Sequence, residues 1–151
     1  MASKLFRKIL IATDGSDYTK SAIEYAVELA KNTEAKLYAI YVIDTAAFAS
    51  IPMDAAWESM YELLKQEGDE ATAYVADKAQ AEGLEVERYT VEGHPAEEIR
   101  KFAEENSVDL IAMGTLGKSG LDRFLLGSVA EKVVRTSKIP VLVVRGKGKQ
   151  K

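Results

Sequence analysis

Residues 109–128 read DLIAMGTLGKSGLDRFLLGS and contain the transition that decides the fold. A short apolar run, Asp109–Met113, has the length and composition of a buried strand. A loop with glycine at 114, 117, 120 and 127 follows it, and a helical pattern begins at Ser128. A buried strand that leads through a glycine-bearing loop into a helix is typical of α/β sheets that bind ligands at the carboxyl ends of their strands.

The same alternation of strand and helix extends over the rest of the chain. Apolar runs predict five strands, and periodic segments between them predict four helices. We expect the strands at Lys8–Thr13, Lys36–Ile43, Val86–Val91, Asp109–Met113 and Pro140–Val144, and the helices from Ser16 or Asp17 to Lys31, from Asp54 to Glu82, from Pro95 onward and from Ser128 to Thr136. Continuous apolar strands separated by helices predict an α/β fold, a single doubly wound domain whose five-stranded parallel sheet carries helices on both faces. We assign this domain to residues 1–146 and expect the basic tail, residues 147–151, to be disordered.

Composition excludes several classes of protein. The 151 residues are 47% hydrophobic and 29% charged, which is ordinary for a folded domain. The chain has no cysteine, so thiol catalysis, disulfides and cysteine-bound zinc are excluded, and its one histidine, His94, leaves little room for a Ser-His-Asp triad. There is no signal-peptide pattern and no apolar run of the roughly 18–20 residues that span a bilayer. We therefore expect a cytoplasmic protein with no membrane partner.

Charge is distributed unevenly along the chain. The formal net charge is −4, which argues against nucleic acid as a partner. Residues 54–105 carry fifteen acidic and five basic groups, as expected for solvated helix faces, whereas residues 106–151 carry nine basic and three acidic groups. The basic C-terminal third is compatible with a small anion as ligand.

The glycine-bearing loop has the chemistry of an anion site. Glycines allow backbone N–H groups to approach phosphate oxygens, and a helix N-terminus favours negative charge. Ser128 can cap the helix or donate its hydroxyl, and Lys118 and Arg123 add positive charge. The alternative is a surface loop with ordinary turn glycines. A P-loop is not favoured, because Gly120 directly follows Lys118-Ser119 where a P-loop has a long helix.

The spacing Gly114-x2-Gly117-x9-Gly127-Ser128 resembles the ATP-binding signature of the universal stress protein family, with no insertion. Two further segments resemble the same family: KILIATDGSDYTKSAIEYA (8–26) its first strand and helix, and GLDRFLLGSVAEKVVRTSKIPVLVVR (120–145) its C-terminal block. The resemblance covers roughly residues 7–145 and implies the strand order 3-2-1-4-5.

The resemblance also implies a ligand and the residues that contact it. The ligand is ATP, with magnesium or manganese on its phosphates. The turn after the first strand, the end of the second strand, and the glycine loop with the following helix would bind it. These residues are Ala12, Thr13, Asp14, Val42, Met113, Gly114, Thr115, Gly117, Lys118, Ser119, Gly120, Gly127, Ser128 and Val129. Asp14 is the one metal contact we expect, directly or through water.

Three of these residues also have a purely structural interpretation. Asp14 can be a turn residue that caps the next helix, Val42 can be an ordinary strand residue, and Lys118 can point into water. We expect His94 in a surface turn, and Glu24 with Glu28 on a solvated helix face. An apolar stripe at helical spacing favours core packing, with a lid beside the nucleotide as the alternative; it consists of Met53, Trp57, Met60, Tyr61 and Leu64.

These observations predict a binding site without a catalytic constellation. The expected function is an ATP-binding universal stress protein that acts as a nucleotide-dependent stress or signalling regulator on a client protein that the sequence does not identify. The alternatives are a slow ATPase or phosphotransferase, and a relative that keeps the fold without binding nucleotide. We expect at most weak ATP hydrolysis. A homodimer is expected through Ile139–Val144, an apolar edge strand that would otherwise stay open.

Overall fold

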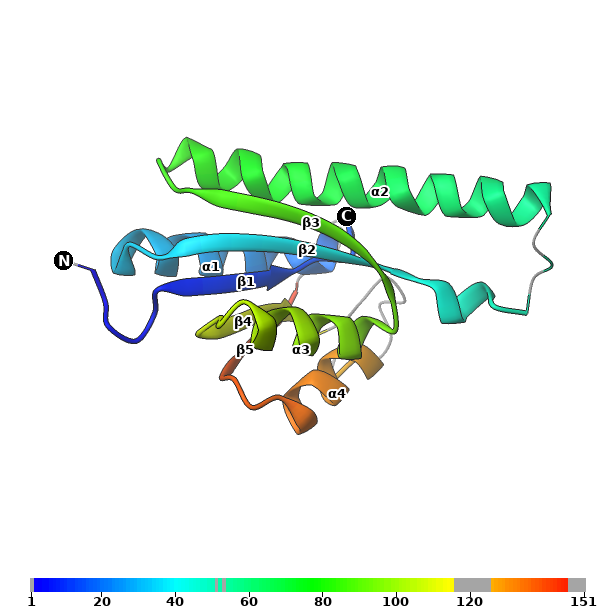
Figure 1. Ribbon diagram of the computed structural model, residues 1–151. Coiled ribbons are helices and arrows are strands. Elements are labelled where there is room, and N and C mark those ends of the chain that lie inside the picture. Colours follow the sequence, from blue (N-terminus) through cyan, green and yellow to red (C-terminus); the bar gives the residue numbers. More distant parts are fainter. Residues whose placement is uncertain (1, 51, 53, 116–125, 147–151) are drawn as a thin grey trace.

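The computed structural model describes residues 2–50, 52, 54–115 and 126–146, and shows alternating strands and helices (Figure 1). In chain order the elements are β1 (Lys8–Ala12), η1 (Asp17–Thr19), α1 (Lys20–Thr33), β2 (Lys36–Asp44), η2 (Thr45–Phe48), α2 (Ala55–Ala81), β3 (Val86–Gly93), α3 (Pro95–Glu105), β4 (Leu110–Gly114), α4 (Ser128–Thr136) and β5 (Val141–Val144). Here η denotes a short 3-10 helix. The predicted tail, residues 147–151, lies outside the described residues.

The strands form one parallel sheet in the order β3-β2-β1-β4-β5. This confirms the predicted α/β class, the strand order and the single domain. The chain leaves β1 toward β2 on one side of the sheet and later returns to β4 on the other side. The carboxyl ends of β1 and β4 therefore lie at the point where the strand order reverses, which is where sheets of this type bind ligands.

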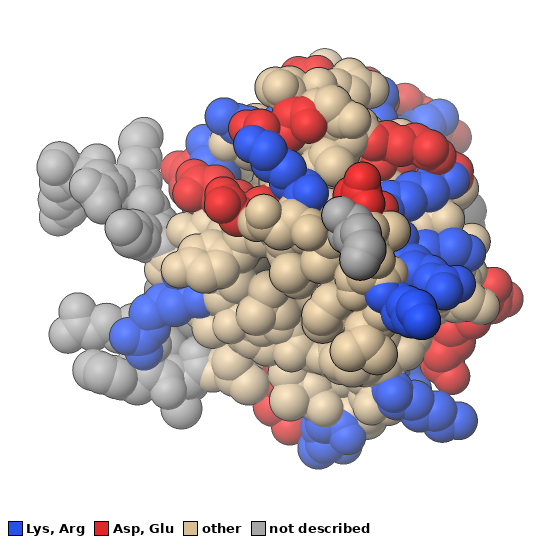
Figure 2. All heavy atoms as spheres, turned by 90° about the vertical axis from the view of Figure 1, so that its left-hand side faces the viewer, with Lys and Arg blue, Asp and Glu red and all other residues tan. Residues whose placement is uncertain are grey.

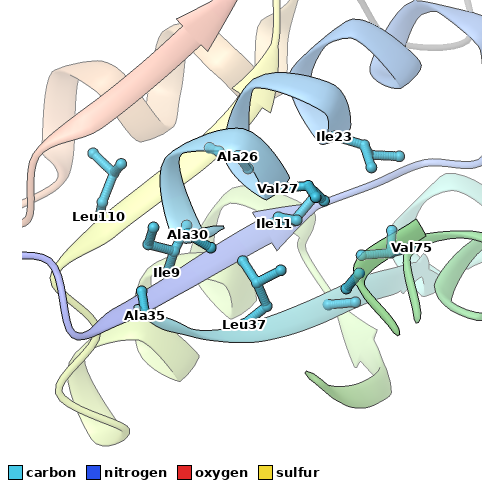
Figure 3. Packing of buried hydrophobic residues seen from close by; sticks show 13 residues of the cluster. Ile9, Ile11, Ile23, Ala26, Val27, Ala30, Ala35, Leu37, Val75 and Leu110 are labelled. Carbon is cyan, nitrogen blue, oxygen red and sulfur yellow. The ribbon is translucent and has the colours of Figure 1, made fainter. Parts of the chain in front are cut away.

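Buried side chains alternate between the two faces of the sheet. Ile9 and Ile11 of β1 face α1 and α2, and Figure 3 shows them packed with Ile23, Val27 and other apolar residues of α1. Leu10 of β1 faces the opposite way, into the cluster beneath α3 and α4. Each face thus has its own apolar core, as expected for a sheet covered on both sides.

Local signals explain most element boundaries. Asp54 caps α2, since its Oδ1 accepts the N–H groups of Ala56 and Trp57 at 3.0 and 3.3 Å. Pro95 occupies the start of α3, and His94 before it is exposed, as predicted. The start of the first helix was predicted wrongly: residues 17–19 form the 3-10 helix η1, and the α-helix begins at Lys20.

Among the described residues, none of the helices combines the length and the apolar character that a membrane span requires.

Candidate functional site

A cavity of about 620 Å³ lies at the carboxyl ends of β1, β2 and β4. All ten predicted site residues that the structure describes line it: Ala12, Thr13, Asp14, Val42, Met113, Gly114, Thr115, Gly127, Ser128 and Val129. The other four predicted residues, Gly117, Lys118, Ser119 and Gly120, lie outside the described residues. A larger depression of about 1060 Å³ follows α2 and the end of β3 and contains none of the predicted residues.

The turn after β1 is fixed by its own hydrogen bonds. Thr13 Oγ1 accepts the N–H of Gly15 at 3.1 Å, and Asp14 Oδ1 accepts the N–H of Ser16 at 2.9 Å. Gly15 has a φ of +82°, a conformation that glycine adopts without the strain a side chain would bring. Thr19 Oγ1 donates to the carbonyl of Ser16 at 2.8 Å. Asp14 is thus both the turn residue of the structural interpretation and a half-buried carboxylate at the cavity wall.

The N-terminus of α4 forms the opposite part of the cavity. Gly127 is the N-cap and Ser128 is the first residue of the helix, so of the two roles open to Ser128 the capping role is excluded. The N–H of Gly127 donates to the carbonyl of Thr115 at 2.6 Å, which holds the helix start against the end of β4. Helical bonding begins with Glu131 N–H to the Gly127 carbonyl at 2.9 Å. The N–H groups of residues 128–130 therefore have no acceptor within the helix.

Two further features of α4 and β4 favour a negatively charged ligand. The hydroxyl Oγ1 of Thr115 is buried and has no hydrogen-bond partner among the residues that the structure describes. Buried polar atoms are nearly always paired in folded proteins, so an unpaired one on a cavity wall suggests that a ligand supplies the partner. The acidic residue in the first turn of α4, Glu131, accepts a hydrogen bond from Arg135 Nε at 2.9 Å, which balances its charge.

The charged side chains among the described lining residues are both acidic. They are Asp14 and Asp44, and the Asp44 carboxylate accepts the N–H of Ala47 at 3.2 Å. No group of three or more histidine, cysteine, aspartate or glutamate side chains within the described ranges is placed to hold a metal ion. Positive potential in the described part of the cavity therefore comes from backbone N–H groups and the dipole of α4.

Side chains from α2 close the β2 side of the cavity; two of them, Met60 and Leu64, belong to the predicted stripe, and Leu63 was not predicted. Met60, Leu63 and Leu64 line this part together with Val42 of β2. The predicted stripe on α2 is therefore divided: Trp57, Tyr61 and Leu64 pack against the buried Tyr41, Ile43 and Ala71, while Met60 faces the cavity. Met53 lies outside the described residues. The sequence did contain a signal for Leu63, because a residue three positions after Met60 lies on the same side of a helix.

Tyr41 of β2 holds α2 against the sheet. Its hydroxyl donates to Glu67 Oε2 of α2 at 2.5 Å, and burial, followed by that hydrogen bond, raises the pKa of Tyr41 well above its ordinary value. A Cβ placed on Gly68 would lie 2.7 Å from Tyr41 Cδ1, so only glycine lets α2 pack this closely on β2. The two contacts fix the distance between α2 and the cavity floor.

The fold and the cavity define a doubly wound α/β protein with a pocket at its topological switch point. The chain belongs to the universal stress protein family, whose model matches residues 5–145. It is 48% identical over 141 residues to the universal stress protein MJ0531 of Methanocaldococcus jannaschii, an alignment that covers 93% of this chain and 83% of that protein.

Solved structures agree with this assignment. The hypothetical protein MJ0577 superposes with a TM-score of 0.83 at 32% identity, covering 96% of this chain and 99% of that one. A universal stress protein solved in complex with cAMP superposes with a TM-score of 0.70 at 27% identity, covering 95% of this chain and all of the other.

Proposed function

We propose that this protein binds ATP, with magnesium or manganese, in the cavity at the carboxyl ends of β1 and β4, and acts in the cytoplasm as a nucleotide-dependent stress or signalling regulator. The observation that carries the proposal is the convergence of residues 12–14, 42, 113–115 and 127–129 on one cavity. A related protein solved in complex with cAMP supports a nucleotide as the ligand class.

The chemistry of the cavity suggests how the ligand would lie. The phosphates would accept hydrogen bonds from the N–H groups of residues 128–130, which have no acceptor within the helix, and from the Thr115 hydroxyl, which has no partner among the described residues. Asp14 would contact the ribose or the metal ion. The apolar side chain of Val42 would contact the base. With two carboxylates on the described wall, a divalent cation would reduce repulsion of the phosphates.

We propose regulation, and not rapid catalysis, as the use of the bound nucleotide. Fast hydrolysis requires a group that orients the attacking water and cations that stabilise charge on the γ-phosphate. The only histidine, His94, is exposed before α3 and is not part of the cavity wall. A ligand that binds one conformation more tightly shifts the protein toward that conformation without being consumed.

We also propose a homodimer through β5. This strand ends the sheet on one side, and its residues Val141, Leu142 and Val143 are only half-buried in the single chain. The other edge strand, β3, carries Glu87 and Arg88, which discourage edge pairing. Light scattering should give a dimer mass at micromolar concentration, and Val141→Lys combined with Val143→Lys should give a monomer. A wild-type monomer, or a dimer that survives both lysines, would refute the interface.

Two measurements test the proposed function. Mass spectrometry of small molecules released from freshly purified, denatured protein should detect adenine nucleotide, and calorimetry should show saturable ATP binding at one site per chain. Absence of both signals would refute the proposal. For the ATPase alternative, phosphate release with magnesium or manganese at saturating ATP should be far below about 1 per second, the lower end of ordinary enzyme turnover. Faster release that is lost in Asp14→Ala, with ATP binding retained, would make the protein an enzyme.

A further inference from the structure

The part of α2 that faces the cavity carries large apolar side chains in contact with solvent. Met60 is 39% exposed and Leu63 is 66% exposed, although both line the cavity. Figure 1 shows that the amino-terminal half of α2 extends past the carboxyl ends of the strands, together with η2. Their neighbours along the helix, Glu58, Glu62 and Lys65, are charged. The two apolar residues thus stand out on a polar stretch of helix.

Core packing does not account for Met60 and Leu63. The inward stripe of α2, Trp57 with Tyr61 and Leu64, already packs on the buried cluster around Ile43, and neither Met60 nor Leu63 belongs to a buried cluster of the described residues. Trp57 and Tyr61 stack with ring centroids 5.5 Å apart, and the Tyr61 hydroxyl donates to Glu92 of β3. The inward stripe therefore holds the helix in place and leaves Met60 to face the cavity, with Leu63 on the rim between the cavity and the larger depression along α2.

The sheet order places this apolar wall opposite the anion-accepting end. The α4 N-terminus adjoins β4, whereas α2 and Val42 adjoin β2, and β1 lies between them. Two interstrand spacings separate β4 from β2, about 10 Å. A nucleotide with its phosphates at α4 and its ribose near Asp14 would therefore direct its base toward α2. This step rests on the proposed function.

We propose that Met60 and Leu63, with Leu64 behind them, form a base-facing wall that selects purine over pyrimidine nucleotides. Apolar contact contributes free energy in proportion to the area removed from water, and a purine offers a larger planar face than a pyrimidine. The described wall on this side is mainly apolar, so discrimination by ring size is what its chemistry favours.

Calorimetric titration of the full chain with ATP, CTP and inorganic tripolyphosphate tests the wall. Leu63→Ser should lower ATP affinity roughly three- to tenfold, as expected for the loss of part of one apolar contact. The same substitution should reduce the ratio of ATP affinity to CTP affinity and leave the affinity for tripolyphosphate unchanged. The matched control is Leu5→Ser, which replaces a leucine that is 76% exposed and lies outside the cavity lining. It should change none of the three affinities.

The outcomes separate this inference from the proposed function. Unchanged ATP affinity in both Leu63→Ser and Met60→Ser, with wild-type binding intact, would overturn the wall and leave the proposed function standing. An equal loss for ATP and tripolyphosphate in a folded variant would also overturn it, because a base contact cannot act on a ligand without a base. Wild-type protein that binds neither ATP nor tripolyphosphate would overturn both.

Discussion

The two ends of the parallel sheet differ in whether their polar groups are paired: those at the amino end bond to one another, and several at the carboxyl end do not. At the amino end, Asp109 Oδ2 accepts the N–H groups of Arg7 and Lys8 at 2.9 and 3.0 Å, and Lys8 Nζ donates to the carbonyl of Asn106 at 3.1 Å. Lys36 forms ion pairs with Glu85 and Glu87. Figure 2 shows the molecule from the amino end of the sheet, where acidic and basic side chains lie next to each other on the surface.

At the carboxyl end the donors stay available. Within the described part of the chain the buried hydroxyl of Thr115 has no partner, and the first N–H groups of α4 have no acceptor in the helix. A folded chain normally pairs its buried polar groups, so unpaired groups that line a cavity are where a ligand would supply the missing partners. Because polar groups are paired at the amino end and unpaired at the carboxyl end, we expect substitutions at the carboxyl end to change ATP affinity and substitutions at the amino end to change the free energy of unfolding.

The largest expected effect is on affinity, from a carboxylate placed at the start of α4. Ser128→Asp should weaken ATP binding roughly 30- to 100-fold, because it sets a negative charge beside the phosphates. The same change should keep or raise the melting temperature, since a negative charge favours a helix N-terminus. Calorimetry and thermal unfolding measure the two effects. Ser128→Asn is the uncharged control, and an equal loss of affinity in both variants would contradict the charge argument.

The next largest effect is expected on the free energy of unfolding, from substitution of Asp109 at the amino end of the sheet. Asp109→Ala removes the acceptor of two backbone N–H groups, so it should lower the free energy of unfolding by about 1–3 kcal/mol. Its ATP affinity should equal that of the wild type. Asp109→Asn keeps one carbonyl acceptor, so its free energy of unfolding should fall by less than that of Asp109→Ala. Urea unfolding and calorimetry are the measurements, and a weakened ATP affinity in folded Asp109→Ala protein would show that the two ends are not separate.

A smaller effect is expected at Thr115, where affinity and stability should change in opposite directions. Thr115→Val removes the unpaired hydroxyl and nearly keeps the shape of the side chain. The free energy of unfolding should stay equal or rise by up to about 1 kcal/mol, and ATP affinity should fall roughly three- to tenfold. A marked loss of stability would mean that the hydroxyl has a structural partner.

The smallest effect is expected at the exposed ion pairs of Lys36. Hydrogen bonds with Glu87 and Glu85 raise the pKa of Lys36, and the hydrogen bond from Lys36 lowers the pKa of Glu87. The pair therefore stabilises the fold between the ordinary pKa values of 4.5 and 10.5. Its contribution is lost as acid protonates Glu87 through its lowered folded pKa, and as alkali deprotonates Lys36 through its raised one.

Thermal unfolding over a range of pH checks this small effect. Lys36→Gln should lower the melting temperature slightly at pH 7, and the difference from wild type should shrink in acid and in high salt. A difference that is constant down to pH 3 would contradict the ion-pair account. ATP affinity at pH 7 should not change.

Much of the fold and about half of the residues that line the described cavity could be predicted from the sequence. Strand positions followed from apolar runs such as Lys36–Ile43, which the structure extends by one residue to Asp44. The family resemblance supplied the individual site residues. The rule that parallel strands end at one edge indicated where they meet, because Thr13 and Gly114 then lie on the same side of the sheet whatever their distance along the chain.

The sequence could not predict which residues of the long helix α2 reach the cavity, because that depends on how the helix is placed relative to the sheet. The stripe of Trp57, Tyr61 and Leu64 indicated an inner face of α2, but no periodicity shows that this helix extends past the strand ends. Leu63 and Met60 therefore reach a cavity formed by other elements. The start of α1 was misplaced for a local reason, because η1 satisfies backbone groups that an early α-helical turn would have used.

The most direct test of the difference between the two ends is a titration of isotope-labelled protein with magnesium-ATP, followed through the backbone amide resonances. The account predicts saturable shifts for the amides of Thr115, Gly127, Ser128 and Val129 at the carboxyl end, with those of Lys8, Lys36 and Asp109 at the amino end unchanged. Saturating ATP that shifts the amino-end amides and leaves those of residues 127–129 in place would contradict it.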